Sequence, residues 1–135
     1  MADALFLKAK QHILNKEVDF DTDTLKLLLV STTDPPVVST DEFLLDIATT
    51  AHVATSSTAL QTPTIANGVF DAADFAFLSI PTTAATIASM IIYQDTGLSS
   101  TSILLYYNDA ASGLPYVPTG ATITVSWDAA GIFSL

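Results

Sequence analysis

The chain has 135 residues, enough for one domain that buries about two-thirds of the surface of its unfolded chain. It has no cysteine, which excludes disulfides, thiolate catalysis and zinc–thiolate sites. Charged residues are 13% of the chain, about half the usual share, and hydrophobic residues are 50%. Threonine, alanine and serine must therefore supply much of the surface. We expect an oligomer or lattice subunit, with a monomer of threonine- and serine-rich surface as the alternative.

The net charge of -10 is unevenly distributed along the chain. No arginine is present, and from residue 27 onward there are nine carboxylates and no lysine. Such a surface repels phosphate backbones, so we expect no direct binding of nucleic acid. We also expect no signal peptide, and no apolar run approaches the length of about 20 residues that spans a bilayer. These features predict a soluble protein without membrane contact, made in a cytoplasm. The basic residues are Lys8, Lys10, Lys16 and Lys26.

Residues 4–15 predict a short amphipathic helix. At about three turns it is marginal alone, so it must pack on a sheet or on a neighbouring subunit. Its lysine side chains are either solvated or paired with an acidic neighbour. The predicted apolar faces carry Leu5, Phe6, Ala9 and Ile13, and the predicted outer face carries Lys8, Lys10 and Gln11.

Residues 24–30 predict a strand whose two faces are both apolar except at Lys26. This pattern is typical of a central strand covered on both sides. Pro35 and Pro36 end it, because proline cannot donate to a β-ladder. Ser39 and Glu42 have the spacing of a capping box, and they predict a second short helix over residues 40–48.

The middle of the chain predicts several short strands, at residues 52–60, 74–80, 86–94 and 102–108. An Asn67-Gly68 turn lies between the first two strands. The strand at 74–80 places Phe75 and Phe77 together. The last two strands form a hairpin joined by the polar loop at 95–101.

Residues 121–128 show the clearest alternation of apolar and polar residues in the chain. We therefore expect a strand whose Ile123, Val125 and Trp127 face one side and anchor a core. The apolar end of the chain, residues 132–135, is expected to be pinned in a sheet or an interface. Six or seven short strands without a βαβ rhythm predict an all-β fold, an antiparallel β-sandwich or jelly-roll-like barrel with two short helices. We expect a single domain over residues 1–135, with a helical arm at 1–16 and a strand or arm at 131–135.

The acidic run at residues 19–23 is a candidate metal site. The spacing of Asp19, Asp21 and Asp23 matches the first three ligand positions of a calcium-binding EF-hand loop. Thr24 and Val30, however, occupy the positions where that loop needs glycine and glutamate. Alternating carboxylates on a solvated strand entry, or facing a partner's basic groups, are the favoured interpretation. We therefore expect no metal and no cofactor.

An enzyme is not expected either. No Gly-x-Ser-x-Gly elbow accompanies His12 or His52, the two histidines of the chain. Asp71 and Asp74 flank an aromatic strand, but two nearby aspartates are unremarkable in so acidic a chain. These patterns predict no catalytic residues.

The aromatic residues predict either an interface or a sugar-stacking platform. Tyr106 and Tyr107 are adjacent in a predicted strand, so they face opposite sides and only one is expected in the core. The outward one is the candidate interface anchor or, alternatively, a carbohydrate contact. The platform would hold Tyr93, Tyr106, Tyr107, Tyr116 and Trp127.

The succession of short motifs resembles a family of small structural proteins of tailed bacteriophages and prophages. The similarity covers nearly the whole chain in the same order, although the segment after Trp127-Asp128 is shorter than the glycine-rich stretch of that family. The resemblance implies a virion component without catalytic residues. The motifs are residues 4–6 (ALF), 18–27 (VDFDTDTLKL), 53–55 (VAT), 67–74 (NGVFDAAD), 91–97 (IIYQDTG), 113–115 (GLP) and 123–128 (ITVSWD).

The resulting hypothesis is a virion structural protein, most simply a capsid decoration or cement subunit that stabilises the head lattice. It would contact copies of itself and other virion proteins, above all the major capsid protein. The alternatives are a tail or baseplate component and a glycan- or receptor-binding module on the virion. The predicted interface residues are Leu5, Phe6, Lys8, Tyr107, Tyr116, Ile132, Phe133 and Leu135.

Overall fold

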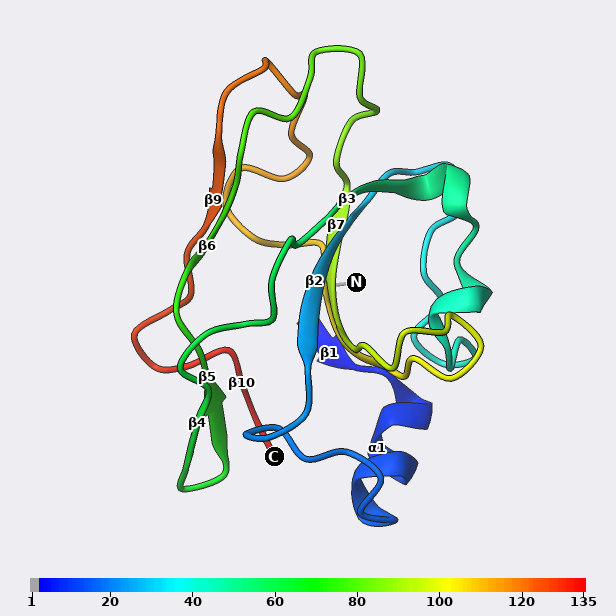
Figure 1. The fold of residues 1–135 in the computed structure, drawn as a ribbon, viewed down its shortest axis with the longest axis vertical. Coiled ribbons are helices and arrows are strands. Elements are labelled where there is room, and N and C mark those ends of the chain that lie inside the picture. The colour runs from blue at the N-terminus through cyan, green and yellow to red at the C-terminus, as the bar shows by residue number, and fades with distance from the viewer. Residues whose placement is uncertain (1–2) are drawn as a thin grey trace.

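Antiparallel sheets dominate the computed structural model, which describes residues 3–135 (Figure 1). The largest sheet has the strand order β1-β8-β7-β2-β3, and two smaller sheets hold β10-β5-β4 and β6-β9. The strands are β1 (Asp3–Leu5), β2 (Leu25–Val30), β3 (His52–Thr55), β4 (Thr64–Ala66), β5 (Val69–Asp71), β6 (Phe75–Phe77), β7 (Ser89–Gln94), β8 (Leu104–Asn108), β9 (Ile123–Val125) and β10 (Phe133–Ser134).

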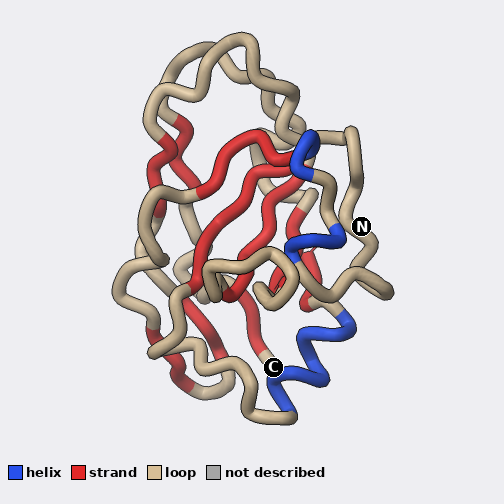
Figure 2. Tube along the Cα trace, turned by 45° about the vertical axis from the view of Figure 1, so that its right-hand side comes forward, coloured by secondary structure: helices blue, strands red, loops and turns tan. Residues whose placement is uncertain are grey.

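The prediction of a mostly β, antiparallel fold is confirmed. Within residues 3–135 none of the three sheets closes on itself, so the predicted sandwich or barrel is not confirmed. Figure 2 shows the strands of the large sheet running through the middle of the molecule, with loops forming much of its outline. The surface of this protein is therefore made largely of loops and short edge strands.

The large sheet is buried on both faces because its central strands are apolar on both sides. Leu27 of β2 pairs with Ile92 of β7, and Leu28 pairs with Ile91, and all four side chains are fully buried. The predicted central strand at 24–30 is thus confirmed as β2. The predicted hairpin of β7 and β8 is also confirmed.

One face of the large sheet packs on the small sheet of β4, β5 and β10. Tyr106 of β8 stacks on Phe133 of β10 with ring centroids 5.6 Å apart. Phe133 also contacts Phe20 and Phe70, with ring centroids at 5.4 and 5.3 Å. This aromatic cluster holds the C-terminal strand in place, so the prediction that residues 132–135 are pinned in a sheet is confirmed.

The opposite face of the large sheet is covered by the N-terminal segment and by residues 37–47. Phe6 is fully buried and meets Tyr107 edge to face, with ring centroids 6.3 Å apart. Tyr106 and Tyr107 are therefore both in the core, and the expectation that only one would be is wrong. Both tyrosines are buried because other segments of the chain pack on each face of the large sheet.

The predicted helix over residues 4–15 begins later than expected. Residues 3–5 form β1, which pairs with β8, and α1 covers Leu7–Leu14. Phe6 connects the two elements and donates its backbone N–H to Leu105 O at 2.9 Å. The predicted helical arm is thus an edge strand followed by a helix, because pairing with β8 satisfies the backbone of residues 3–5.

The predicted second helix over residues 40–48 is replaced by two single 3₁₀ turns, η1 (Leu44–Asp46) and η2 (Thr49–Ala51). The predicted capping by Ser39 and Glu42 does not occur. Asp46 instead accepts the backbone N–H groups of Glu42 and Phe43 at 2.8 and 2.9 Å. Leu44 donates its N–H to Ser102 O, which holds the segment against the β7–β8 hairpin instead of in a helix.

The remaining short strands match the predictions in part, because β3 ends at Thr55 where a strand over residues 52–60 was predicted, and β6 covers only Phe75–Phe77 of the predicted residues 74–80. Asn67 and Gly68 both have positive φ and connect β4 to β5, as the Asn-Gly signal predicts. Phe75 and Phe77 of β6 lie with ring centroids 4.9 Å apart. In β9, Val125 is buried, Ile123 is half-buried and Thr124 is exposed, so the alternation of residues 121–128 is confirmed. Trp127 beyond it is half-buried.

Candidate functional site

Titratable side chains of the described residues serve local structure. No group of three histidine or acidic residues within 3–135 is arranged to hold a metal ion. His12 lies between the carboxylates of Glu17 and Glu42. The Nε2 atom of His52 lies 3.2 Å from Ile47 O. Both histidines therefore tie segments of the fold together.

The acidic run at residues 19–23 folds into a turn. Asp23 accepts the backbone N–H of Asp19 at 2.7 Å, and Asp19 accepts that of Asp21 at 3.3 Å. Hydrogen bonding from the Asp21 side chain lowers the pKa of Asp19, while the same contact raises the pKa of Asp21. The carboxylates thus stabilise their own turn, in agreement with the interpretation preferred from the sequence.

The predicted aromatic platform is not present as a surface. Tyr93, Tyr106 and Tyr107 are each less than one-tenth exposed. Trp127 donates its ring N–H to Ala73 O at 3.2 Å. Tyr116 is half-buried and forms two backbone hydrogen bonds with Ile87, both 2.8 Å long. Three of the five rings are therefore part of the internal packing, and Tyr116 and Trp127 remain half-buried.

The predicted interface residues divide into two groups. Three of them, Phe6, Tyr107 and Ile132, are buried inside the subunit and offer no surface to a neighbour in this conformation. The others retain accessible surface, from half-buried to 73% exposed at the last residue. These are Leu5, Lys8, Tyr116, Phe133 and Leu135.

Two hollows adjoin these residues. A groove of about 600 Å³ lies between the edge strands β1 and β10, lined by Leu5, Lys10, Tyr106, Phe133 and Leu135 among others. A cavity of about 510 Å³ lies where Tyr116 and residues 111–114 pass over the large sheet beside β9. Neither hollow could be predicted from the sequence, because each depends on how separate sheets meet.

Exposed aliphatic side chains form the most distinctive surface feature. They lie in three separate regions, although isolated exposed aliphatic residues are common in any protein. The first region is on α1 and the loops beside it, the second is on the loops after β6 and before β9, and the third is on the sheet of β4, β5 and β10 (Figure 1). The regions comprise Leu7, Leu14, Val37, Leu45 and Leu98, then Leu78 and Val117, then Ile65 and Leu135.

The first region is held rigidly by backbone contacts. Leu7 donates its N–H to Val38 O at 2.9 Å, and Leu45 donates to Ser99 O at 3.0 Å. These bonds bring α1, the loop at 37–47 and the loop at 95–103 to one side of the molecule. A backbone that is already fixed loses little further entropy on binding, which suits a contact surface.

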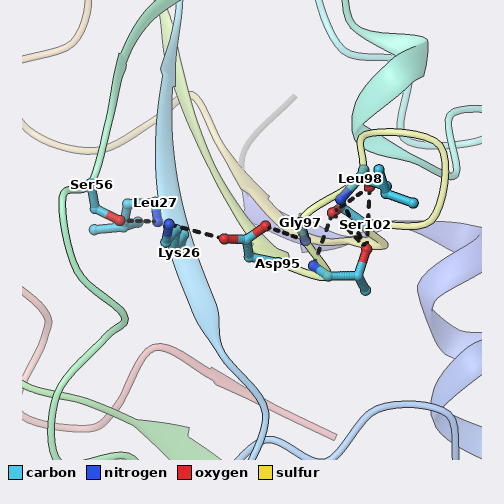
Figure 3. A network of polar contacts seen from close by, with 8 residues as sticks. Lys26, Leu27, Ser56, Asp95, Gly97, Leu98 and Ser102 are labelled. Atoms are coloured by element: carbon cyan, nitrogen blue, oxygen red, sulfur yellow. Dashed lines mark hydrogen bonds and ion pairs between the residues drawn. The ribbon is translucent and has the colours of Figure 1, made fainter.

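A polar network holds the loop that carries Leu98 (Figure 3). The ammonium group of Lys26 lies 2.9 Å from the Asp95 carboxylate, and Asp95 accepts the Gly97 N–H at 3.0 Å. The Ser102 hydroxyl donates to Leu98 O at 2.8 Å. The ion pair and the hydrogen bond from Gly97 lower the pKa of Asp95, which keeps the carboxylate charged and the loop anchored.

The outer face of α1 combines apolar and basic groups. Ala9 is buried beneath the helix, so Leu7, Gln11 and Leu14 point outward, with Leu7 55% and Leu14 84% exposed. Lys8 and Lys10 flank this outward stripe on its two sides. The predicted inner face with Phe6 and Ala9 and the predicted outer face with Lys10 and Gln11 are confirmed, whereas the sequence prediction placed Leu7 and Leu14 on neither face.

Three of the four lysines lie on α1 or just after it. Within the described part of the chain Lys8, Lys10 and Lys16 have no carboxylate within ion-pairing distance, whereas Lys26 pairs with Asp95. Asp71, Asp74 and Asp128 lie around β5, β6 and the turn after β9, across the molecule from α1 (Figure 1). Glu17 and Glu42 lie beside α1, where both contact His12, so carboxylates are present on both sides of the molecule.

No protein-family model matches the chain, and no curated protein matches it. No helix within residues 3–135 is long and apolar enough to cross a membrane.

Proposed function

We propose that this protein is a structural component of a bacteriophage virion, and specifically a capsid decoration subunit that stabilises the head lattice. The observation that carries the proposal is the distribution of exposed aliphatic side chains over three separate regions of one small chain. A dimer needs one apolar contact surface. A subunit with neighbours on several sides needs several.

The energetics of a lattice favour such a surface. A standard protein interface buries about 1,600 Å² in total, and several weak contacts on one subunit multiply their effect when all are made together. Leucine and valine side chains contribute about 1.5–3 kcal/mol each when fully buried. The sparse charge of the chain keeps the cost of desolvating such contacts low.

The acidic surface fits a position on the outside of a DNA-filled particle. With a net charge of -10 and no lysine or arginine from residue 27 onward, the body of the chain repels nucleic acid. In this proposal the two small sheets pack on the large sheet as a sandwich-like unit. The partners are copies of the same chain and the major capsid protein.

Immunogold electron microscopy tests the proposal directly. Antibodies against this chain would be applied to phage particles induced from the strain that carries the gene, with particles from a strain lacking the gene as the control. Gold on the heads is the expected result. Gold on the tail tip would move the protein to the tail or baseplate, and unlabelled particles would contradict a virion role.

A further inference from the structure

Asn67 is exposed at the tip of the β4–β5 hairpin, which projects at the lower left of the molecule in Figure 1. Its φ is 54° and that of Gly68 is 79°, so the two residues form a tight turn. Neither the Asn67 side-chain amide nor the Gly68 N–H has a hydrogen-bond partner within residues 3–135. Gly68 has no side chain, so its nitrogen lies unhindered next to a free carboxamide. In this arrangement an asparagine can react with its own backbone.

We propose that Asn67 is a site of spontaneous modification, at which the Gly68 backbone nitrogen attacks the side-chain carboxamide. The nitrogen bonds to Cγ of Asn67 and loses its proton, the bond from Cγ to Nδ2 breaks, and ammonia leaves a succinimide ring behind. Water then opens the ring at either carbonyl carbon. One opening gives aspartate, and the other gives isoaspartate, whose backbone runs through the side chain and is longer by a methylene group. The inference is independent of the proposed function, because it follows from the chemistry of the turn.

The hairpin can supply the movement that ring closure needs. Asn67 must rotate about its backbone bonds to bring the Gly68 nitrogen onto Cγ, and this rotation opens the turn. All three residues of β4 are exposed, and β4 lies at the edge of its sheet, where it pairs with β5. Local opening costs little free energy where few apolar side chains are buried. The turn can therefore open while the buried strands of the large sheet stay folded.

The other two asparagines of the chain are held differently. Asn108 is half-buried at the end of β8, and its Oδ1 accepts the N–H groups of Ala110 and Ala111 at 2.9 and 3.0 Å. Asn15 is exposed just after α1, but the nitrogen that would attack it belongs to Lys16. That N–H donates to a carbonyl of the last turn of α1 at 3.1 Å. Both asparagines are therefore internal controls for the reaction at Asn67.

Modification at this turn acts on the C-terminal strand. Gly68 O accepts the Leu135 N–H at 2.9 Å, a bond that helps to hold the end of the chain against the β4–β5 hairpin. The two backbones are close, since an added Cβ on Gly68 would lie 3.3 Å from Leu135 O. Isoaspartate lengthens the backbone directly before Gly68 and adds a carboxylate, so it displaces Gly68 O from Leu135. The modified chain therefore holds its last residues less tightly.

Peptide mass spectrometry of the full-length protein, aged in mildly alkaline buffer, tests the inference. Only time points at which the circular dichroism spectrum is unchanged are compared, so that the protein under study is folded. We expect conversion at Asn67 to be at least about tenfold faster than at Asn15 or Asn108. Both products are expected, and methylation by an isoaspartyl methyltransferase distinguishes isoaspartate from aspartate. Equal conversion at all three asparagines, unchanged Asn67, or aspartate without isoaspartate would overturn the attack by Gly68.

Digestion with carboxypeptidase A measures the effect on the end of the chain. Aged wild-type protein should release Leu135 at least about twofold faster than fresh protein, because fewer bonds hold β10 in place. Asn67→Gln is the matched control, since its longer side chain closes the corresponding ring far more slowly. After the same ageing it should show neither the mass gain nor the faster release. Equal release from aged and fresh wild-type protein would contradict the displacement of Leu135.

Discussion

His12 shows how a single side chain joins two segments of the chain. Its imidazole contacts Glu17 after α1 and Glu42 before η1, and its ring lies 5.9 Å from that of Phe43. Burial lowers the pKa of His12, but the hydrogen bonds and negative charges of the two glutamates outweigh burial, so the pKa is raised above its ordinary value. The contact is therefore strongest when the imidazole is protonated.

The raised pKa of His12 predicts a stability contribution that depends on pH. It is fully present below the unfolded pKa of about 6.5 and is lost as the pH rises through the higher folded value. We expect His12→Gln to lower the free energy of unfolding by up to about 1 kcal/mol near pH 5.5, and by less near pH 9. Urea unfolding at both pH values measures the difference. His52→Gln is the control, and an equal loss from His12→Gln at both pH values would contradict the role of the imidazolium.

Gly131 is required where the turn after β9 returns to β5. Its φ is +107°, and an added Cβ would lie 2.3 Å from Val69 Cγ1. We expect Gly131→Ala to destabilise the protein by about 2–4 kcal/mol, because strain and a steric clash combine. Gly97→Ala is the matched control: its φ is +87°, but nothing lies within 4 Å, so it should cost about 1 kcal/mol. Equal losses in urea unfolding would show that the close approach to β5 is not energetically important.

At the scale of elements, the N-terminal segment is part of the core. β1 pairs with β8, and Phe6 is fully buried against Tyr107. We expect Phe6→Ala to lower the free energy of unfolding by about 3–5 kcal/mol, as for other buried phenylalanines. Leu7→Ala is the control, because Leu7 is 55% exposed and its loss should cost less than about 0.5 kcal/mol. Similar stability of both variants in thermal and urea unfolding would mean that the segment is a detachable arm.

Short-range patterns predicted the elements that depend on local chemistry. The apolar run at residues 24–30 identified β2, the alternation of residues 121–128 identified β9, and the Asn67-Gly68 pair identified the turn between β4 and β5. Residues 4–6 were predicted as helix because the apolar spacing continues into α1, whereas their strand conformation depends on β8, about a hundred residues later. Ser39 and Glu42 failed as a cap because residues 42–44 pair with residues 102–104 instead.

The candidate contact surface was only partly predictable for the same reason. Low charge and the clustering of lysines near the N-terminus were evident in the sequence. The sequence did not show which apolar residues would be exposed. Phe6 and Tyr107 are buried against each other, whereas Leu14 is left exposed. Those outcomes depend on how sheets and loops pack over long sequence distances.

At the scale of the whole molecule, we propose that this chain is a subunit with contacts on several sides. Its exposed aliphatic groups occupy three regions. Self-association of the unmodified protein is the requirement that contacts between copies share.

The mass of the purified wild-type protein in solution, measured by light scattering over a range of concentrations, tests that requirement most directly. The account predicts a mass that rises with concentration to a multiple of the 14.2 kDa of one chain. A mass of 14.2 kDa at every concentration would contradict it, and the exposed leucines would then be ordinary features of a monomer's surface.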